Sequence, residues 1–196
     1  MPVGPTGLAE PPSGTAVQRA AQVMTTLVRV SAERIFANQS PLSQGAMAPQ
    51  RILENNCQLF FRAVGEELAR QGLPAWNSEF PLTKLGELTA DKTAEWVAKN
   101  TSGAWLRIGS WSEAQQAAND GAVVIGALRA DASERRVYGH LVVVVPMKRS
   151  INPSEADGPY VLDGNERLLG TTPDDPHRVS RVGADLDAWQ WFMRLR

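Results

Sequence analysis

The sequence predicts an α+β fold, because helical patterns come first and strand-like runs follow. Segments with helical patterns lie between residue 16 and residue 118, whereas runs rich in β-branched residues begin at residue 122. A short polar link joins the first two of these runs, so they should pair as an antiparallel hairpin. Helices followed by antiparallel strands are typical of the α+β class.

The first part of the chain divides into a tail, a helix and a loop. Residues 1–15 are rich in Pro and Gly and predict a flexible tail, which leaves residues 16–196 as a single domain. From residue 16 to about residue 37 the apolar residues share one helical face. Residues 38–49 are polar with two prolines, which indicates a loop.

The segment NNCQLFFRAVGEELARQG predicts a second helix that carries the cysteine. Asn55 or Asn56 is suited to cap its start, and Gly72 followed by Pro74 ends it. This boundary places Cys57 in the first turn, with the following apolar residues facing the core.

The remaining elements complete the expected domain. A short helix is predicted over residues 89–99, and Ser110 with Glu113 forms a capping box for a helix over residues 111–118. Strands are predicted over residues 122–128 and 137–145, and a third begins at PYVLDG. Residues 171–177 are expected to form a loop, and the tail from residue 185 should close the sheet as a strand.

Composition excludes several classes of function. Apolar residues make up 43% of the chain and charged residues 21%, with a formal net charge of -1. No cluster of basic residues stands out, so nucleic acid is not expected as a partner. No stretch approaches the roughly 18 apolar residues of a membrane helix. The first residues lack a basic segment before an apolar core, so we expect synthesis in the cytoplasm without a signal peptide.

The scarcity of cysteine and histidine narrows the possible chemistry. The chain has one cysteine and two histidines, so we expect no internal disulfide, no zinc cluster and no other cofactor. A thiol–imidazole mechanism can use only Cys57 with His140 or His177. His177 lies between Pro and Arg in the polar run TTPDDPHRV, which favours a solvated surface position.

Cys57 has a physical reason to be reactive if it begins a helix. The positive end of the helix dipole favours a thiolate, and an unpaired N–H in the first turn can stabilise an oxyanion. The alternative is a buried structural cysteine, since free cysteines are among the most buried residues.

His140 is expected in a central strand whose two faces are both apolar. A buried imidazole needs a polar partner, and Gly139 beside it indicates close approach by another backbone or a ligand. The alternative is a core histidine satisfied by a backbone carbonyl. Asp163 or Asn165 on the next strand can orient the ring, although DGN is also a typical turn sequence.

These motifs resemble a known superfamily. The helix-borne cysteine in NNCQLFFRAV and the later Gly-His strand GHLVVVV are similar to those of the NlpC-type and CHAP-type cysteine peptidases, which are compact papain-like hydrolases. The resemblance covers residues 50–165. It implies a papain-like α+β fold with Cys57 as the nucleophile, His140 as the general base and Asp163 as the orienting residue. This last position usually holds His, Asn or Gln.

The resemblance also implies a substrate and a setting. The superfamily mostly hydrolyses amide bonds in peptidoglycan peptides, and this chain resembles the amidase toxins that type VI secretion systems inject into the periplasm of rival bacteria. A cognate immunity protein and a secretion component are then the expected partners. An effector that deamidates or cross-links host proteins and a non-enzymatic binding protein are the alternatives.

Trp105, Trp111 and residues 38–56 are candidates to line the cleft, although both tryptophans also suit the core.

Overall fold

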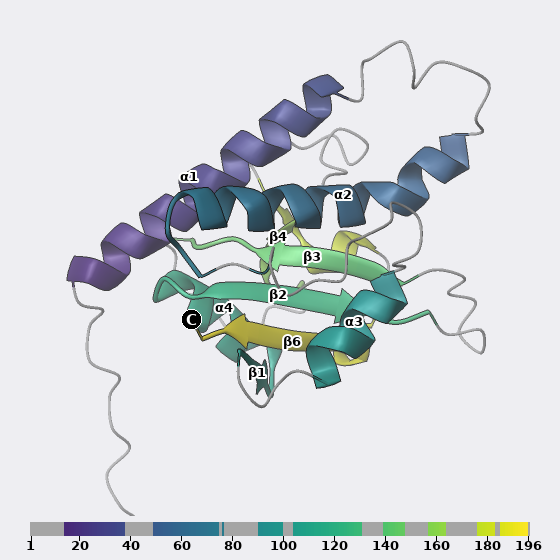
Figure 1. Cartoon of the computed structure of the whole chain (residues 1–196). Coiled ribbons are helices and arrows are strands. Elements are labelled where there is room, and N and C mark those ends of the chain that lie inside the picture. The colour runs from purple at the N-terminus through teal and green to yellow at the C-terminus, as the bar shows by residue number, and fades with distance from the viewer. Residues whose placement is uncertain are drawn as a thin grey trace, which may run out of the picture.

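The computed structural model describes residues 14–37, 49–74, 76, 90–99, 104–130, 139–147, 157–163, 176–182 and 185–195. These residues form an α+β fold, as the sequence predicts (Figure 1). The helices are α1 (Gly14–Ala37), α2 (Pro49–Arg70), α3 (Ala90–Lys99) and α4 (Trp111–Asn119). The strands are β1 (Trp105–Ile108), β2 (Val123–Leu128), β3 (His140–Val144), β4 (Tyr160–Leu162), β5 (His177–Arg178) and β6 (Trp189–Arg194).

The strands form one antiparallel sheet in the order β1-β6-β2-β3-β4-β5. The hairpin of β2 and β3 is confirmed, with Leu128 opposite His140 and Ile125 opposite Val143. The tail strand β6 is also confirmed, and it lies between β1 and β2 rather than at an edge. Both faces of β2 and β3 are buried, because helices cover the two sides of the sheet.

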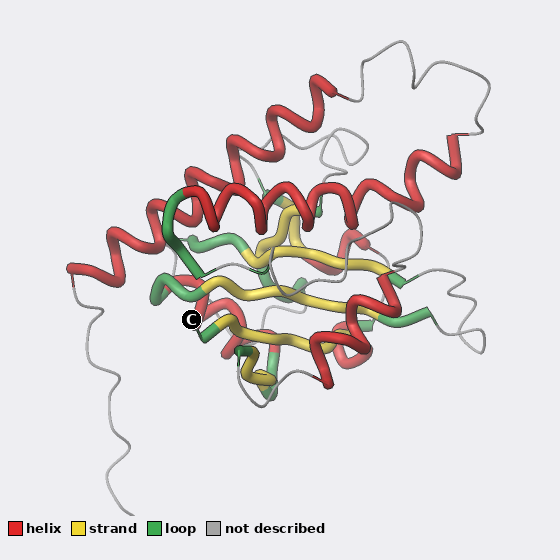
Figure 2. Tube along the Cα trace, viewed as in Figure 1, coloured by secondary structure: helices red, strands yellow, loops and turns green. Residues whose placement is uncertain are grey.

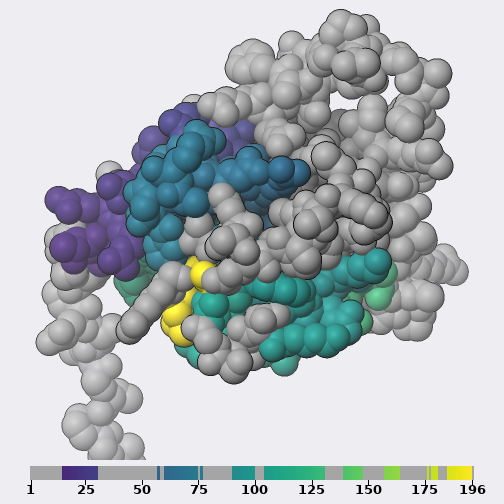
Figure 3. All heavy atoms as spheres, viewed as in Figure 1, coloured from purple at the N-terminus to yellow at the C-terminus, as the bar shows by residue number. Residues whose placement is uncertain are grey.

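Helices α2 and α3 pack on one face of the sheet, α1 packs against α2, and α4 lies on the opposite face (Figures 1 and 2). The core between the sheet and α2 and α3 buries large side chains, including Phe60, Trp76, Trp105 and Phe192. The core on the α4 side contains Val142, Val144, Trp189 and Trp191, among others. Figure 3 shows the surface on which α1 and α2 lie side by side.

The predicted start of the second helix is wrong. The structure begins α2 at Pro49, so Asn55 and Asn56 lie inside the helix and do not cap it. Proline suits the first helical position, because its φ is already helical and its missing N–H has no partner to lose there. The predicted end is confirmed. Gly72 adopts a φ of 69°, donates to Ala69, and is followed by a Leu73 N–H that donates to Leu68, as in a Schellman motif.

Other boundaries shift by small amounts. Helix α1 begins at Gly14, inside the predicted tail, and residues 1–13 lie outside the described chain. The capping box is confirmed in outline. Ser110 Oγ accepts the Glu113 N–H, while the Glu113 carboxylate accepts from Gly109 rather than from Ser110. The sequence reading missed β1, because a four-residue edge strand leaves little periodicity to detect.

His177 is not in a loop. It begins the two-residue strand β5 and pairs with Val161 of β4, so the predicted loop over residues 171–177 is wrong at its last position. A strand this short depends on its neighbour for its backbone hydrogen bonds, which local sequence does not reveal. Within the described ranges, no helix is long and apolar enough to cross a membrane.

Candidate active site

Antiparallel pairing brings His140 and Asp163 to the same face of the sheet. Leu162 at the end of β4 lies opposite Val143, so the next residue, Asp163, falls opposite Val142. His140 and Val142 are two positions apart on β3 and therefore share a face. Asp163 is thus a diagonal neighbour of His140, within reach of its ring.

The two side chains make a direct, largely buried contact. His140 Nε2 lies 2.6 Å from Asp163 Oδ2, and the side chains are 17% and 2% exposed. With the carboxylate ionised, the ring nitrogen donates. This contact leaves Nδ1 as the ring nitrogen that can face a further partner.

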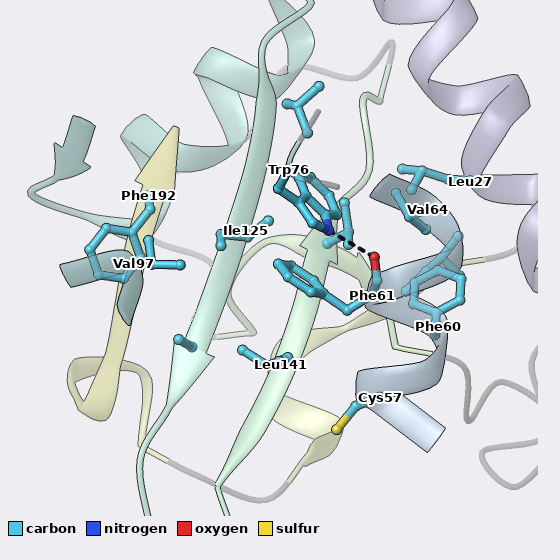
Figure 4. Close-up of a cluster of buried hydrophobic side chains, with 14 of the residues drawn as sticks. Leu27, Cys57, Phe60, Phe61, Val64, Trp76, Val97, Ile125, Leu141 and Phe192 are labelled. Atoms are coloured by element: carbon cyan, nitrogen blue, oxygen red, sulfur yellow. Dashed lines mark hydrogen bonds between the residues drawn. The ribbon is translucent and has the colours of Figure 1, made fainter. Parts of the chain in front are cut away.

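That further partner is the thiol of Cys57. Cys57 belongs to the core cluster on the α2 side of the sheet, and Figure 4 shows its sulfur directed from α2 towards the strands. His140 belongs by alternation to the opposite face, but it is the first residue of β3. Cys57 therefore meets the ring of His140 at the start of the strand, close enough to raise the pKa of the imidazole.

This arrangement controls the charge of the imidazole. Burial alone would lower the pKa of His140, because it disfavours the charged ring. Hydrogen bonds from the ring to Asp163 and Cys57, together with the negative charges of these groups, outweigh burial and raise the pKa from 6.5 to about 10. These interactions favour the protonated ring, which lies between the Asp163 carboxylate and Cys57.

Cys57 does not occupy the helix start. It lies more than two turns into α2, so its N–H belongs to the hydrogen-bonded ladder of the helix. The expected contributions of the helix dipole and of a free first-turn amide are therefore absent at Cys57. Cys57 instead lies beside the ring of His140.

Trp189 of β6 forms another side of the site. Its ring meets His140 edge to face, with centroids 6.2 Å apart, and stacks on Trp191 at 5.6 Å. Trp189 is 5% exposed, so it shields this side of the imidazole from water. The sequence reading did not select Trp189. Its alignment with His140 depends on the insertion of β6 beside β2.

The burial and the partners of Cys57 and His140 bear on the alternatives of a structural cysteine and a core histidine. Cys57 is buried, at 2% exposure, as a core cysteine would be. His140, however, is partnered by two ionisable side chains and not by a backbone carbonyl alone. Gly139 does mark a close approach, because a Cβ there would lie 2.9 Å from the Leu128 carbonyl oxygen and 2.8 Å from Asp91.

The other candidates fall outside the site or outside the described residues. Asn165 and residues 38–48 are not described, nor is the side chain of His177. Residues 49–56 belong to α2 rather than to a loop. Trp105 is fully buried in the core, and Trp111 packs against the core on the α4 side. Nowhere in the described part of the chain do three or more His, Cys, Asp or Glu residues gather in a metal-binding group.

These features define an α+β protein with a Cys–His–Asp constellation at one end of a central strand. No protein-family model matches the chain, and its sequence has no significant match among curated proteins. The geometry of these three residues is therefore the feature that indicates a function.

Proposed function

We propose that this protein is a cysteine hydrolase that cuts amide bonds. The observation that carries the proposal is the continuous contact from Cys57 through His140 to Asp163. A nucleophile, a base and a residue that orients the base are the three parts that thiol-dependent acyl transfer requires. The ionised Asp163 keeps the imidazole protonated, and the imidazolium in turn favours the thiolate of Cys57.

A papain-like arrangement is the fold that best suits these contacts. A cysteine-bearing helix packs on an antiparallel sheet, the histidine begins the adjacent core strand, and the orienting residue ends the next strand. This order along the chain supports the resemblance to the NlpC-type and CHAP-type peptidases. The position of Cys57 inside α2 departs from that pattern. In the proposal, the charge of His140 takes the place of the helix dipole in stabilising the thiolate.

Acylation begins from the thiolate–imidazolium pair. Cys57 Sγ attacks the carbonyl carbon of the amide and forms a C–S bond, and the carbonyl oxygen takes the negative charge. His140 gives its proton to the amide nitrogen as the C–N bond breaks. The amine leaves, and the acyl group remains on Cys57 as a thioester.

Deacylation returns the site to its starting state. Neutral His140 takes a proton from water, and the resulting hydroxide attacks the thioester carbon. The C–S bond breaks, the carboxylic acid leaves, and Cys57 departs as a thiolate. His140 keeps the proton, held by Asp163, so the imidazolium is restored.

The proposed substrate is the peptide portion of peptidoglycan. The resemblance supports this choice, since amide hydrolysis in stem peptides and cross-links is the main activity of the superfamily. In the same proposal the protein is an antibacterial toxin delivered by a type VI secretion system into the periplasm of a target cell. An immunity protein in the producing cell would then protect it.

Mass spectrometry of digested peptidoglycan tests this function. Purified sacculi are incubated with the wild type, with Cys57→Ala and with His140→Gln, and soluble fragments and new amino groups are measured. We expect fragments with new free amines from the wild type alone. His177→Gln is the matched control, since it removes the chain's other histidine and should leave the digestion unchanged.

The other outcomes point to the other readings. Inert sacculi together with conversion of Gln to Glu in host proteins would indicate a deamidase. Isopeptide cross-links in those proteins would indicate a transglutaminase-like activity. Inert sacculi and inert proteins, with Cys57→Ala losing stability alone, would indicate a non-enzymatic binding protein.

A further inference from the structure

Asp91 lies beside the backbone that carries His140. It is in the first turn of α3, and its Oδ1 accepts the N–H of Ala130 at 2.5 Å. Ala130 follows the end of β2, where Leu128 pairs with His140. The carboxylate of Asp91 therefore holds the chain as it leaves β2, next to the start of β3.

The same carboxylate also approaches the other strand of the hairpin. A Cβ built on Gly139 would lie 2.8 Å from Asp91 Oδ1 and 2.9 Å from the Leu128 carbonyl oxygen. Real Cβ atoms do not approach this closely, so residue 139 must be glycine for both contacts to persist. Asp91 and Gly139 thus fit together immediately before His140 in the sequence.

We propose that Asp91 is a positioning residue that fixes the end of the β2–β3 hairpin and so aligns the His140 ring with Cys57. Helix α3 supplies one carboxylate that contacts the backbone after β2 and lies against the backbone before β3. His140 is the first residue beyond this clamp, and its ring reaches both the thiol and Asp163.

The inference rests on the proposed function, because alignment matters most if Cys57 must be activated. A displacement of about 1 Å at a reacting group can cost about 10²-fold in rate. Loss of the clamp should therefore weaken the contact between ring and thiol and lower the reactivity of Cys57. If the Asp91 carboxylate served stability alone, Asp91→Ala would lower the melting temperature and leave the titration of His140 unchanged.

The experiment measures His140 and Cys57 directly in the full chain. A His177→Gln background leaves one imidazole, whose NMR signals are followed through a pH titration. The rate of Cys57 carboxymethylation by iodoacetamide is measured on the same samples. We expect Asp91→Ala to lower the pKa of His140 and to slow the reaction about 10- to 100-fold.

Two further variants keep the test decisive if Asp91→Ala does not fold. Asp91→Asn retains an oxygen that can accept from Ala130, so it should restore most of the rate. The Cβ added in Gly139→Ala pushes against the Asp91 carboxylate from the β3 side. This variant should therefore act like Asp91→Ala. Glu95→Ala is the matched control, since Glu95 lies one turn further along α3 and pairs with the exposed Lys99.

The outcomes separate this inference from the proposed function. Unchanged His140 titration and an unchanged alkylation rate in Asp91→Ala, or in Gly139→Ala if the first variant is unfolded, would overturn the positioning role. If the wild type leaves peptidoglycan intact while Asp91→Ala still changes both readouts, the positioning role stands and the proposed substrate fails.

Discussion

The ring of His140 and the carboxylate of Asp163 form one unit, with Nε2 and Oδ2 2.6 Å apart across neighbouring strands. Asp163 is almost fully buried, so its charge is poorly screened by water. This contact, together with Cys57, raises the pKa of His140 to about 10 although burial acts in the opposite direction. The strand register therefore places beside the candidate base the carboxylate that favours its protonated form.

Removal of the Asp163 charge should lower the pKa of His140. Asp163→Ala deletes the hydrogen bond and the negative charge while the ring stays buried, so neutral imidazole becomes favoured. We therefore expect a larger share of neutral imidazole and slower alkylation of Cys57 at neutral pH, with about a tenfold change in the protonation equilibrium of the ring for each pKa unit lost. NMR titration and iodoacetamide kinetics measure the two effects.

Asp163→Asn separates the hydrogen bond from the charge. The amide oxygen still accepts from Nε2, and amides are common at this position in the resembled superfamily. In Asp163→Asn we expect the pKa of His140 and the rate of Cys57 alkylation to lie between those of the wild type and Asp163→Ala. Equal values for all three proteins would contradict the role given to Asp163.

The charge of His140 should also make stability depend on pH. Its folded-state pKa of about 10 lies above the ordinary value of 6.5, so the protonated ring stabilises the fold. That contribution is fully present below pH 6.5 and is lost as the pH rises towards 10. Urea unfolding of Cys57→Ser, in which no thiol titrates, is compared with unfolding of the same protein carrying His140→Gln.

We expect the difference in free energy of unfolding between these two proteins to shrink as the pH rises above 6.5. The slope should not exceed about 1.4 kcal/mol per pH unit, the value for one proton. A difference that stays constant with pH would show that His140 binds its proton no more tightly in the folded state than in the unfolded state.

Cys57 should react with small reagents in preference to large ones. Its 2% exposure restricts access, whereas the proposed mechanism requires a nucleophilic thiolate at this position. We expect iodoacetamide to react with it faster than with a free-thiol control at neutral pH, and bulky maleimides to react more slowly. His140→Gln should slow iodoacetamide, and His177→Gln should not. An unreactive thiol in the wild type would favour a structural cysteine.

Gln115 should be important for the stability of the strands that carry the site. It is fully buried, donates to the Val145 carbonyl and accepts from the Tyr160 N–H, so it connects the ends of β3 and β4 to α4. Gln115→Ala leaves these buried groups unpaired and should cost about 1–3 kcal/mol per lost partner. Urea denaturation measures the change.

The next residue provides the control for this experiment. Gln116 is exposed and donates to the exposed Asp120, the residue that follows α4. Gln116→Ala should therefore change the free energy of unfolding by less than about 0.5 kcal/mol. Equal losses in the two variants would mean that helix propensity, and not the link to β3 and β4, explains the effect at Gln115.

The sequence by itself determined the order of elements and the candidate pair. Apolar spacing indicated the helices, and β-branched runs joined by a short polar link indicated the β2–β3 hairpin, because these patterns report directly on local structure. Ser110 and Gly72 marked helix ends through capping rules that act over a few residues. The scarcity of cysteine and histidine restricted any thiol–imidazole chemistry to Cys57 with one of two histidines.

The tertiary structure decided what depends on distant segments. Helix α2 begins at Pro49, so the helix terminus lies far from Cys57 and the nearby group is the ring of His140. The tertiary structure inserted β6 beside β2 and so brought Trp189 against the imidazole. It also placed Asp163 beside His140 through strand register. Such contacts join residues far apart in the chain, and local propensity carries no information about them.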